Sequence, residues 1–187
     1  MRRVVIGISG ASGTAYGVRI LELLQPLEGV ETHLIVTHPG AKTLAHETDR
    51  TLDDLKTLSD VWHPIERIGA TIASGSFLTD GMIIAPCSVN TMSSIAVGAA
   101  SNLLVRAADV VLKERRRLVL AVRESPLHLG HLRSMTALAE MGAIIAPPMP
   151  AFYQRPQSVD EIVDHGARRI LDLFGLGGDE AQRWKGI

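Results

Sequence analysis

The sequence predicts an α/β protein, a three-layer sandwich in which helices cover both faces of a mostly parallel β-sheet. Short apolar runs alternate along the chain with segments whose apolar residues recur at helical spacing, a pattern typical of parallel sheets. Two of the apolar runs lead directly into small polar loops that begin a helix. Hydrophobic residues make up 46% of the chain and aromatic residues only 4%, which predicts an aliphatic, closely packed core.

Each element of this fold follows from a local pattern. Strands are expected where short apolar runs stand between turn-forming residues, at 4–9, 32–37, 81–86, 118–122 and 143–146. Helices are expected where apolar residues recur every three or four positions, at 14–24, 41–47, 52–60, 91–99, 130–141 and 159–174, and in a segment that begins at Arg106. Residues 146–156 contain four prolines, which exclude a helix and predict an extended arm or lid.

The bulk properties limit the classes of function. A chain of 187 residues predicts a single domain at 1–175, followed by a C-terminal arm at 176–187. The net charge of -1 argues against nucleic-acid binding, and no apolar run approaches the roughly 20 residues of a membrane span. The apolar run near the N-terminus is too short for a signal peptide, and the single cysteine, Cys87, fits the reducing cytoplasm. We therefore expect a cytoplasmic protein.

The first small-residue loop, at 7–13, reads GISGASG between a predicted strand and a predicted helix. Backbone N–H groups in this position can hold a phosphate, and the hydroxyls of Ser9 and Ser12 could add to them. The spacing is neither GxGxxG nor that of a P-loop. The second strand ends in Thr37 and His38 where a dinucleotide enzyme would carry an acidic residue, so a mononucleotide such as FMN is favoured over NAD. A purely structural tight turn is the alternative.

The second loop follows the predicted strand at 81–86 and reads CSVNT at 87–91. Ser88 and Thr91 are spaced either to bind a ligand or to cap the helix that begins there. Cys87 could be a nucleophile, but no histidine partner stands nearby, which favours a packed small residue.

A third feature is the concentration of positive charge at 106–124, which holds six of the 19 Lys and Arg residues. Arg106 and Lys113 share a helical face, and Arg123 and Glu124 follow a predicted strand at its carboxyl end. Cations that converge there predict an anionic ligand, most simply a phosphate. Because Asp109 lies between Arg106 and Lys113, ordinary surface ion pairs are an open alternative.

Taken together, these segments and several others resemble a known family. The motifs are GISGASGTAYGVR at 7–19, HETD at 46–49, ASGSF at 73–77, PCS at 86–88, RAADVVLKERR at 106–116, VRE at 122–124 and FYQRPQS at 152–158. In this order they resemble the UbiX/Pad1 family of flavin prenyltransferases over nearly the whole chain. The resemblance implies a flavodoxin-like or Rossmann-like fold and a homo-oligomer, expected to be a dodecamer, with ligand sites shared between subunits.

The reaction that the resemblance implies joins dimethylallyl monophosphate to reduced FMN, at N5 and then at C6. The product, prenylated FMN, would pass to a UbiD-type decarboxylase. No metal is implied, and the sequence lacks the DDxxD-type cluster that would hold Mg²⁺. His128 and His131 have a spacing that can suit a metal, but without a third ligand a structural role is favoured.

The resemblance also assigns residues. For FMN it implies a set of small and polar residues that ends in one cation: Gly10, Ala11, Ser12, Thr37, Ser88, Val89, Asn90, Thr91 and Arg123. For the dimethylallyl phosphate it implies Tyr153, Arg169, Arg106, Lys113 and Glu124. The catalytic set would be Ser12, Glu47, Glu124, Lys113 and Arg106, with the cations neutralising the leaving phosphate and Glu124 and Ser12 moving a proton.

Two other functions compete with this interpretation. A flavin-dependent decarboxylase of peptidyl cysteine would need an early catalytic histidine and a substrate clamp, whereas this chain carries the prenyl-phosphate residues. A carrier or chaperone of FMN or prenylated FMN would need only the flavin loops. The chain also departs from the family where His38 and Pro39 replace a frequent Lys-Ala pair, and where residues 67–69 lack an aromatic, so the shape of the pocket is left open.

Overall fold

The computed structural model describes residues 1–178. Most of the predicted C-terminal arm, at 179–187, lies outside the described residues, so the division at residue 175 stays a prediction. The strands are β1 (Arg2–Ile8), β2 (Val30–Val36), β3 (Val61–Trp62), β4 (Gly81–Cys87), β5 (Arg117–Val122) and β6 (Ile144–Ile145). The α-helices are α1 (Thr14–Leu24), α2 (His38–Glu47), α3 (Leu52–Leu58), α4 (Val89–Ala96), α5 (Leu103–Lys113), α6 (Leu129–Glu140) and α7 (Val159–Asp172). Two 3₁₀ turns are η1 (Thr71–Ala73) and η2 (Phe152–Gln154).

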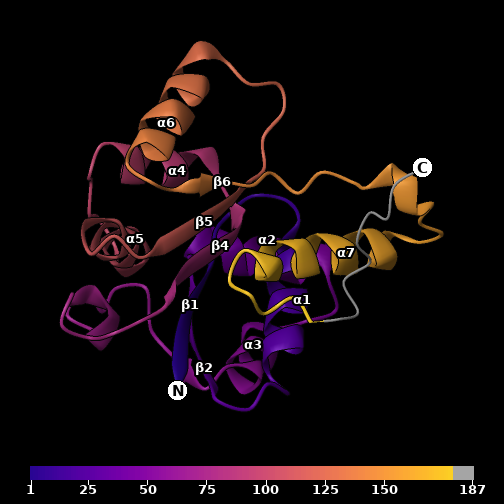
Figure 1. Cartoon of the computed structure of the whole chain (residues 1–187), viewed down its shortest axis with the longest axis horizontal. Coiled ribbons are helices and arrows are strands. Elements are labelled where there is room, and N and C mark those ends of the chain that lie inside the picture. Colours follow the sequence, from indigo (N-terminus) through magenta and orange to yellow (C-terminus); the bar gives the residue numbers. More distant parts are fainter. Residues whose placement is uncertain (179–187) are drawn as a thin grey trace.

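The strands form one parallel sheet in the order β3-β2-β1-β4-β5-β6, with helices on both faces (Figure 1). Successive side chains of a strand point to opposite faces. Val4 and Ile6 of β1 therefore pack with α1, α2, α3 and α7, whereas Val5 packs with α4, α5 and α6. The prediction of a three-layer α/β sandwich with a parallel sheet is confirmed.

The helices and strands differ from their predicted bounds where a polar contact defines an end. β1 begins at Arg2, because Arg2 and Arg3 pair with Asp80 and Glu31 and can continue the strand despite their charge. The helix expected from Arg106 begins earlier, at Leu103, because the side chain of Asn102 caps it. β3 was not predicted, since a strand of two residues carries too little pattern.

The proline-rich segment at 146–156 is mostly extended, as predicted, but the exclusion of any helix was wrong. Phe152 begins a single 3₁₀ turn between Pro150 and Pro156, a turn too short to conflict with either proline ring. The segment then leads into α7, whose 14 residues make it the longest α-helix that the structure describes. None of the helices in residues 1–178 has the length and apolar character that crossing a membrane requires.

Candidate functional site

The carboxyl ends of the central strands meet at one edge of the sheet, and the loops that follow them surround a cavity of about 430 Å³. Every residue that the resemblance assigned to FMN lines this cavity: Gly10, Ala11, Ser12, Thr37, Ser88, Val89, Asn90, Thr91 and Arg123. Pro39, Asn102 and Glu124 complete its wall. The structure thus brings together, in one place, residues from five separate segments of the chain.

Three helices begin at this cavity, and each begins with a capping side chain that also lines it. The Thr37 hydroxyl accepts the N–H of Gly40 at 3.0 Å, and the Ser88 hydroxyl accepts the N–H of Thr91 at 3.3 Å. The side-chain oxygen Oδ1 of Asn102 accepts the N–H of Val105 at 3.0 Å. The amino end of a helix carries partial positive charge, so three such ends and the Arg123 guanidinium favour an anionic or electron-rich ligand.

The amino end of α1 is different, because a carboxylate of the protein itself occupies it. Glu47 Oε2 accepts the N–H of Gly13 at 2.9 Å and both the N–H and the hydroxyl of Thr14, at 3.0 and 2.9 Å. Burial raises the pKa of Glu47. These hydrogen bonds and one from the Ser12 hydroxyl lower it by more, so the net pKa lies below the usual value. Glu47 thus occupies the N–H groups of Gly13 and Thr14, where a phosphate was expected to bind.

Ser9 also has a role other than the one predicted. Its side chain is fully buried, its hydroxyl donates to the Pro86 carbonyl at 2.9 Å, and it accepts the N–H of Ser88 at 2.7 Å. Both functions of the hydroxyl are thus used to join the first loop to the second. Ser9 positions the cavity wall rather than binding a phosphate oxygen.

Pro39 and Asn102 are the lining residues that sequence reasoning missed. Pro39 packs against Gly10 so closely that a Cβ on Gly10 would lie 2.3 Å from the Pro39 Cβ. The signal for Asn102 was present, since Asn before an apolar helical run is a typical N-cap, but nothing in the sequence places that cap beside the flavin loops.

Cys87 is a packed core residue. It is fully buried among apolar side chains, and burial raises the pKa of its thiol far above the ordinary range. A thiol in this state is a poor nucleophile, which agrees with the interpretation favoured from the sequence.

Within one chain, only part of the charged segment at 106–124 reaches the flavin cavity. Arg123 and Glu124 line the cavity, but Arg106 and Lys113 do not. Arg106 pairs with Asp109 at 2.8 Å, the ion pair that the spacing allowed, because both residues lie on the same face of α5. Lys113 pairs with Glu114.

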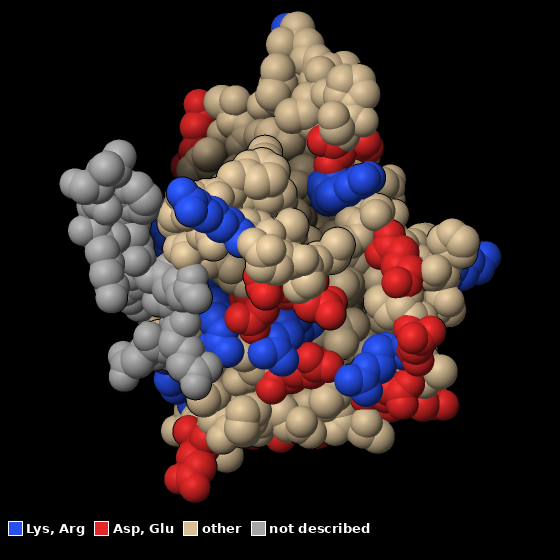
Figure 2. All heavy atoms as spheres, turned by 90° about the vertical axis from the view of Figure 1, so that its right-hand side faces the viewer, with Lys and Arg blue, Asp and Glu red and all other residues tan. Residues whose placement is uncertain are grey.

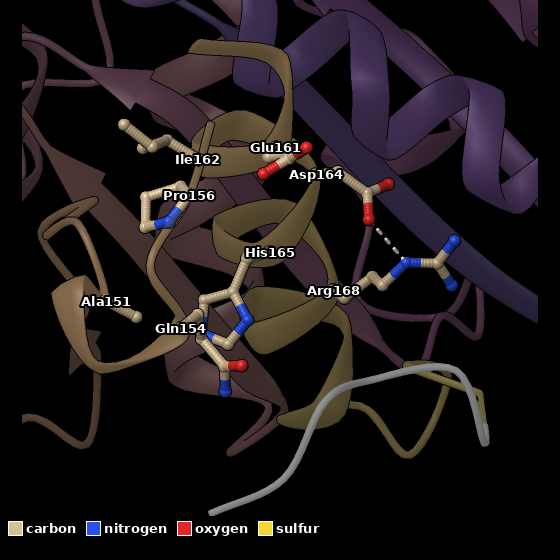
Figure 3. A pocket seen from close by; sticks show the side chains of 8 residues that line it. All are labelled: Ala151, Gln154, Pro156, Glu161, Ile162, Asp164, His165 and Arg168. Carbon is tan, nitrogen blue, oxygen red and sulfur yellow. Dashed lines mark hydrogen bonds and ion pairs between the residues drawn. The ribbon is translucent and has the colours of Figure 1, made fainter. Parts of the chain in front are cut away.

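Tyr153 and Arg169 lie away from this cavity, on η2 and α7. The Tyr153 ring meets the edge of His165, with centroids 6.2 Å apart. Arg169, with 65% of its side chain exposed, lines a separate cavity of about 250 Å³ between α7 and the segment at 144–149. Its sequence neighbour Arg168 instead pairs with Asp164 at 2.8 Å beside a smaller cavity (Figure 3).

The surface around α7 carries charges of both signs. Figure 2 shows basic and acidic side chains interspersed on this face rather than gathered into a patch of one sign. The groove between α1 and α7 contains pairs of this kind, among them Arg19 with Asp164 at 2.7 Å and Arg50 with Glu22 at 2.9 Å. Such exposed pairs contribute little to stability and mark no ligand site by themselves.

His128 and His131 stack on each other, with ring centroids 3.5 Å apart, at the start of α6. His128 caps α6 through Nδ1, which accepts the N–H groups of Gly130 and His131. Within residues 1–178 no three His, Cys, Asp or Glu side chains are grouped in a way that could hold a metal ion. The cap of α6 is a structural role for His128, the role that the sequence favoured.

The family model "Flavoprotein" matches residues 1–171, which include the cavity, and this match shows that the chain is a flavoprotein. The flavin prenyltransferase UbiX of Thauera aromatica is 54% identical over 184 residues, which cover 98% of this chain and 94% of that protein. The chain belongs to the UbiX family of flavin prenyltransferases, which confirms the resemblance.

Two solved structures are similar to the whole chain. The dodecameric FMN-dependent UbiX-like decarboxylase from Escherichia coli O157:H7 has a TM-score of 0.96 at 47% identity, covering 98% of this chain and 100% of that one. AnUbiX (PadA1), solved in complex with FMN and dimethylallyl pyrophosphate, has a TM-score of 0.97 at 43% identity, covering 100% and 98%.

Proposed function

We propose that this protein transfers a dimethylallyl group from dimethylallyl monophosphate to reduced FMN and releases prenylated FMN. The observation that carries the proposal is the cavity in which every residue assigned to FMN meets, within a chain that matches flavin prenyltransferases over its full length. The carrier and the cysteine decarboxylase are less well supported, because relatives at this identity are flavin prenyltransferases.

The cavity fits an anionic mononucleotide. Short side chains and glycine at Gly10, Ala11 and Ser12 leave room for a ring system, and the helix amino ends at Ser88 and Thr37 favour a phosphate. Arg123 supplies a full positive charge at the same wall. When bound, reduced FMN supplies the nucleophilic ring atoms, and the residues of this chain hold it in place and keep water away.

We assign proton transfer to Ser12 and Glu124, which both line the cavity, with Glu47 as the residue that positions Ser12. Arg106, Lys113, Tyr153 and Arg169 are assigned to the phosphate of the allyl donor. Positive charge at a leaving phosphate lowers the barrier to breaking its C–O bond.

Those four donor residues lie outside the cavity of their own chain, so we propose that a second copy of the chain completes each site. A homo-oligomer, expected to be a dodecamer like the E. coli neighbour, supplies such copies. Mixing Arg169→Ala subunits with Glu124→Gln subunits tests this. At a low concentration of dimethylallyl monophosphate each variant alone should have little activity. Mixed oligomers should regain activity if the two residues come from different chains, whereas no recovery would contradict sharing.

The activity itself is tested by incubating the protein without oxygen with chemically reduced FMN and dimethylallyl monophosphate, followed by mass spectrometry of the released flavin. A mass gain of one C5H8 unit is expected. A flavin that binds but stays unmodified with both the monophosphate and the diphosphate would favour a carrier. Activation of a UbiD-type decarboxylase by the product would then test the proposed recipient.

A further inference from the structure

Asn102 lines the flavin cavity, although it belongs to none of the segments that the family resemblance assigned to a ligand. Two hydrogen bonds hold the backbone on the carbonyl side of Asn102. The carbonyl of Asn102 accepts the N–H of Arg106 at 3.0 Å, and the next N–H, that of Leu103, donates to the Ile65 carbonyl at 3.0 Å. The residue is therefore held at the cavity wall before any ligand binds.

The cap also fixes which end of the Asn102 amide can face a ligand. Oδ1 accepts the N–H of Val105 at 3.0 Å, and a backbone N–H can bond only to the oxygen of the amide. The nitrogen Nδ2 is then the other end of the side chain, and it can only donate. Among residues 1–178 no hydrogen bond from Nδ2 to a protein acceptor is formed.

Asn102 differs in this respect from the two other caps at the cavity. The hydroxyls of Thr37 and Ser88 can rotate and can both donate and accept. The amide nitrogen of Asn102 accepts nothing, so it discriminates in favour of an acceptor atom on the ligand.

We propose that the Asn102 side chain is a specificity-determining donor of the flavin site, which bonds an acceptor oxygen of the bound flavin nucleotide while its own oxygen caps α5. The inference rests on the proposed function, since it takes FMN as the ligand. Two groups of FMN share the required chemistry, namely the carbonyl oxygens of the ring and the oxygens of the phosphate.

The variant Asn102→Asp separates the two roles of the side chain. Asp is as good an N-cap as Asn, so the stability of α5 should be kept. The donor, however, is replaced by a carboxylate oxygen that would face the ligand's oxygen. We expect the Kd for FMN to rise about tenfold or more, with the melting temperature of the ligand-free protein nearly unchanged.

Two further variants control the experiment. Asn102→Ser keeps a neutral cap but is shorter, so a hydroxyl that accepts the N–H of Val105 no longer reaches the position of Nδ2. It should weaken FMN binding less than Asp does but still measurably. Ser158→Asp adds the same charge at the cap of α7, outside the cavity, and should leave the Kd unchanged. Wild-type affinity in Asn102→Ser, or an equal loss in Ser158→Asp, would overturn the proposal.

Riboflavin, which lacks the phosphate, identifies the acceptor. If Asn102→Asp weakens the binding of riboflavin and of FMN equally, the hydrogen bond is to the ring. If it weakens the binding of FMN alone, the hydrogen bond is to the phosphate. Binding is measured directly by flavin fluorescence, without turnover. If wild-type protein binds FMN and Asn102→Asp binds it equally well, this inference fails alone, whereas no binding by wild type would contradict the proposed function too.

Discussion

The flavin cavity and the donor residues on α5, η2 and α7 differ in how much of a site one chain can build. The cavity forms within one chain, because most of its wall consists of loops that directly follow parallel strands and of residues that cap helices. Arg106 and Arg169, in contrast, lie on helix surfaces at different places, where Arg106 pairs with Asp109 of its own helix.

The difference shows which kind of site a parallel sheet provides without further assembly. Strand ends converge at one edge, so backbone groups and short side chains are brought together by topology alone. Long cationic side chains on helix faces have no such constraint and form local ion pairs until another partner competes for them. Flavin binding should therefore be a property of the single chain, and catalysis a property of the assembly.

The largest effect is expected at Glu124, which lines the flavin cavity but was assigned to the phosphate cluster. Glu124→Gln keeps the shape and removes the proton-accepting charge, so prenylation should slow about 100-fold while the Kd for FMN stays the same. Stopped-flow and fluorescence titration measure the two quantities. Glu140→Gln on the exposed end of α6 is the matched control. Undiminished turnover in Glu124→Gln would show that Glu124 has no part in the mechanism.

Arg169→Ala tests the other region. Loss of a charged partner for the donor phosphate should raise the KM for dimethylallyl monophosphate about 10- to 100-fold, without a change in FMN affinity. Arg133→Ala, which removes an exposed arginine on α6, should change neither the KM nor the FMN affinity. A parallel loss of FMN binding in Arg169→Ala would show that the two regions are not separate.

The same contrast explains what the sequence could predict. α1 at 14–24 agrees with its predicted bounds, and the flavin loops were located, because both depend on neighbouring residues. The sequence could not show whether Arg106 pairs with Asp109 or binds a ligand, because its position on the helix allows both. Glu47 reaches the amino end of α1 from more than 30 positions away, a contact that only tertiary structure creates.

Gly10→Ala should damage the flavin cavity alone. The new Cβ would lie 2.3 Å from the Pro39 Cβ, so the first loop and α2 must move apart. An overpacked contact of this kind costs about 1–3 kcal/mol, and we expect roughly a tenfold rise in the Kd for FMN. Gly69→Ala is the control, because a Cβ there meets no atom within 4 Å. Normal FMN affinity in Gly10→Ala would mean that Pro39 can move to make room for the new Cβ without a change in the flavin site.

The smallest effect concerns the amino end of α1, which Glu47 satisfies in place of a ligand. The folded pKa of Glu47 is depressed, so the stability that its carboxylate contributes is present above the unfolded value of about 4.3 and is lost as pH falls through the lower, folded value. At neutral pH, Glu47→Gln should reduce the free energy of unfolding by about 1 kcal/mol after allowance for solvent screening, and the deficit should shrink below about pH 4. Denaturant unfolding at several pH values measures this, with Glu28→Gln as the exposed control. A deficit that persists unchanged in acid would mean that the Glu47 carboxylate contributes through packing rather than through its charge.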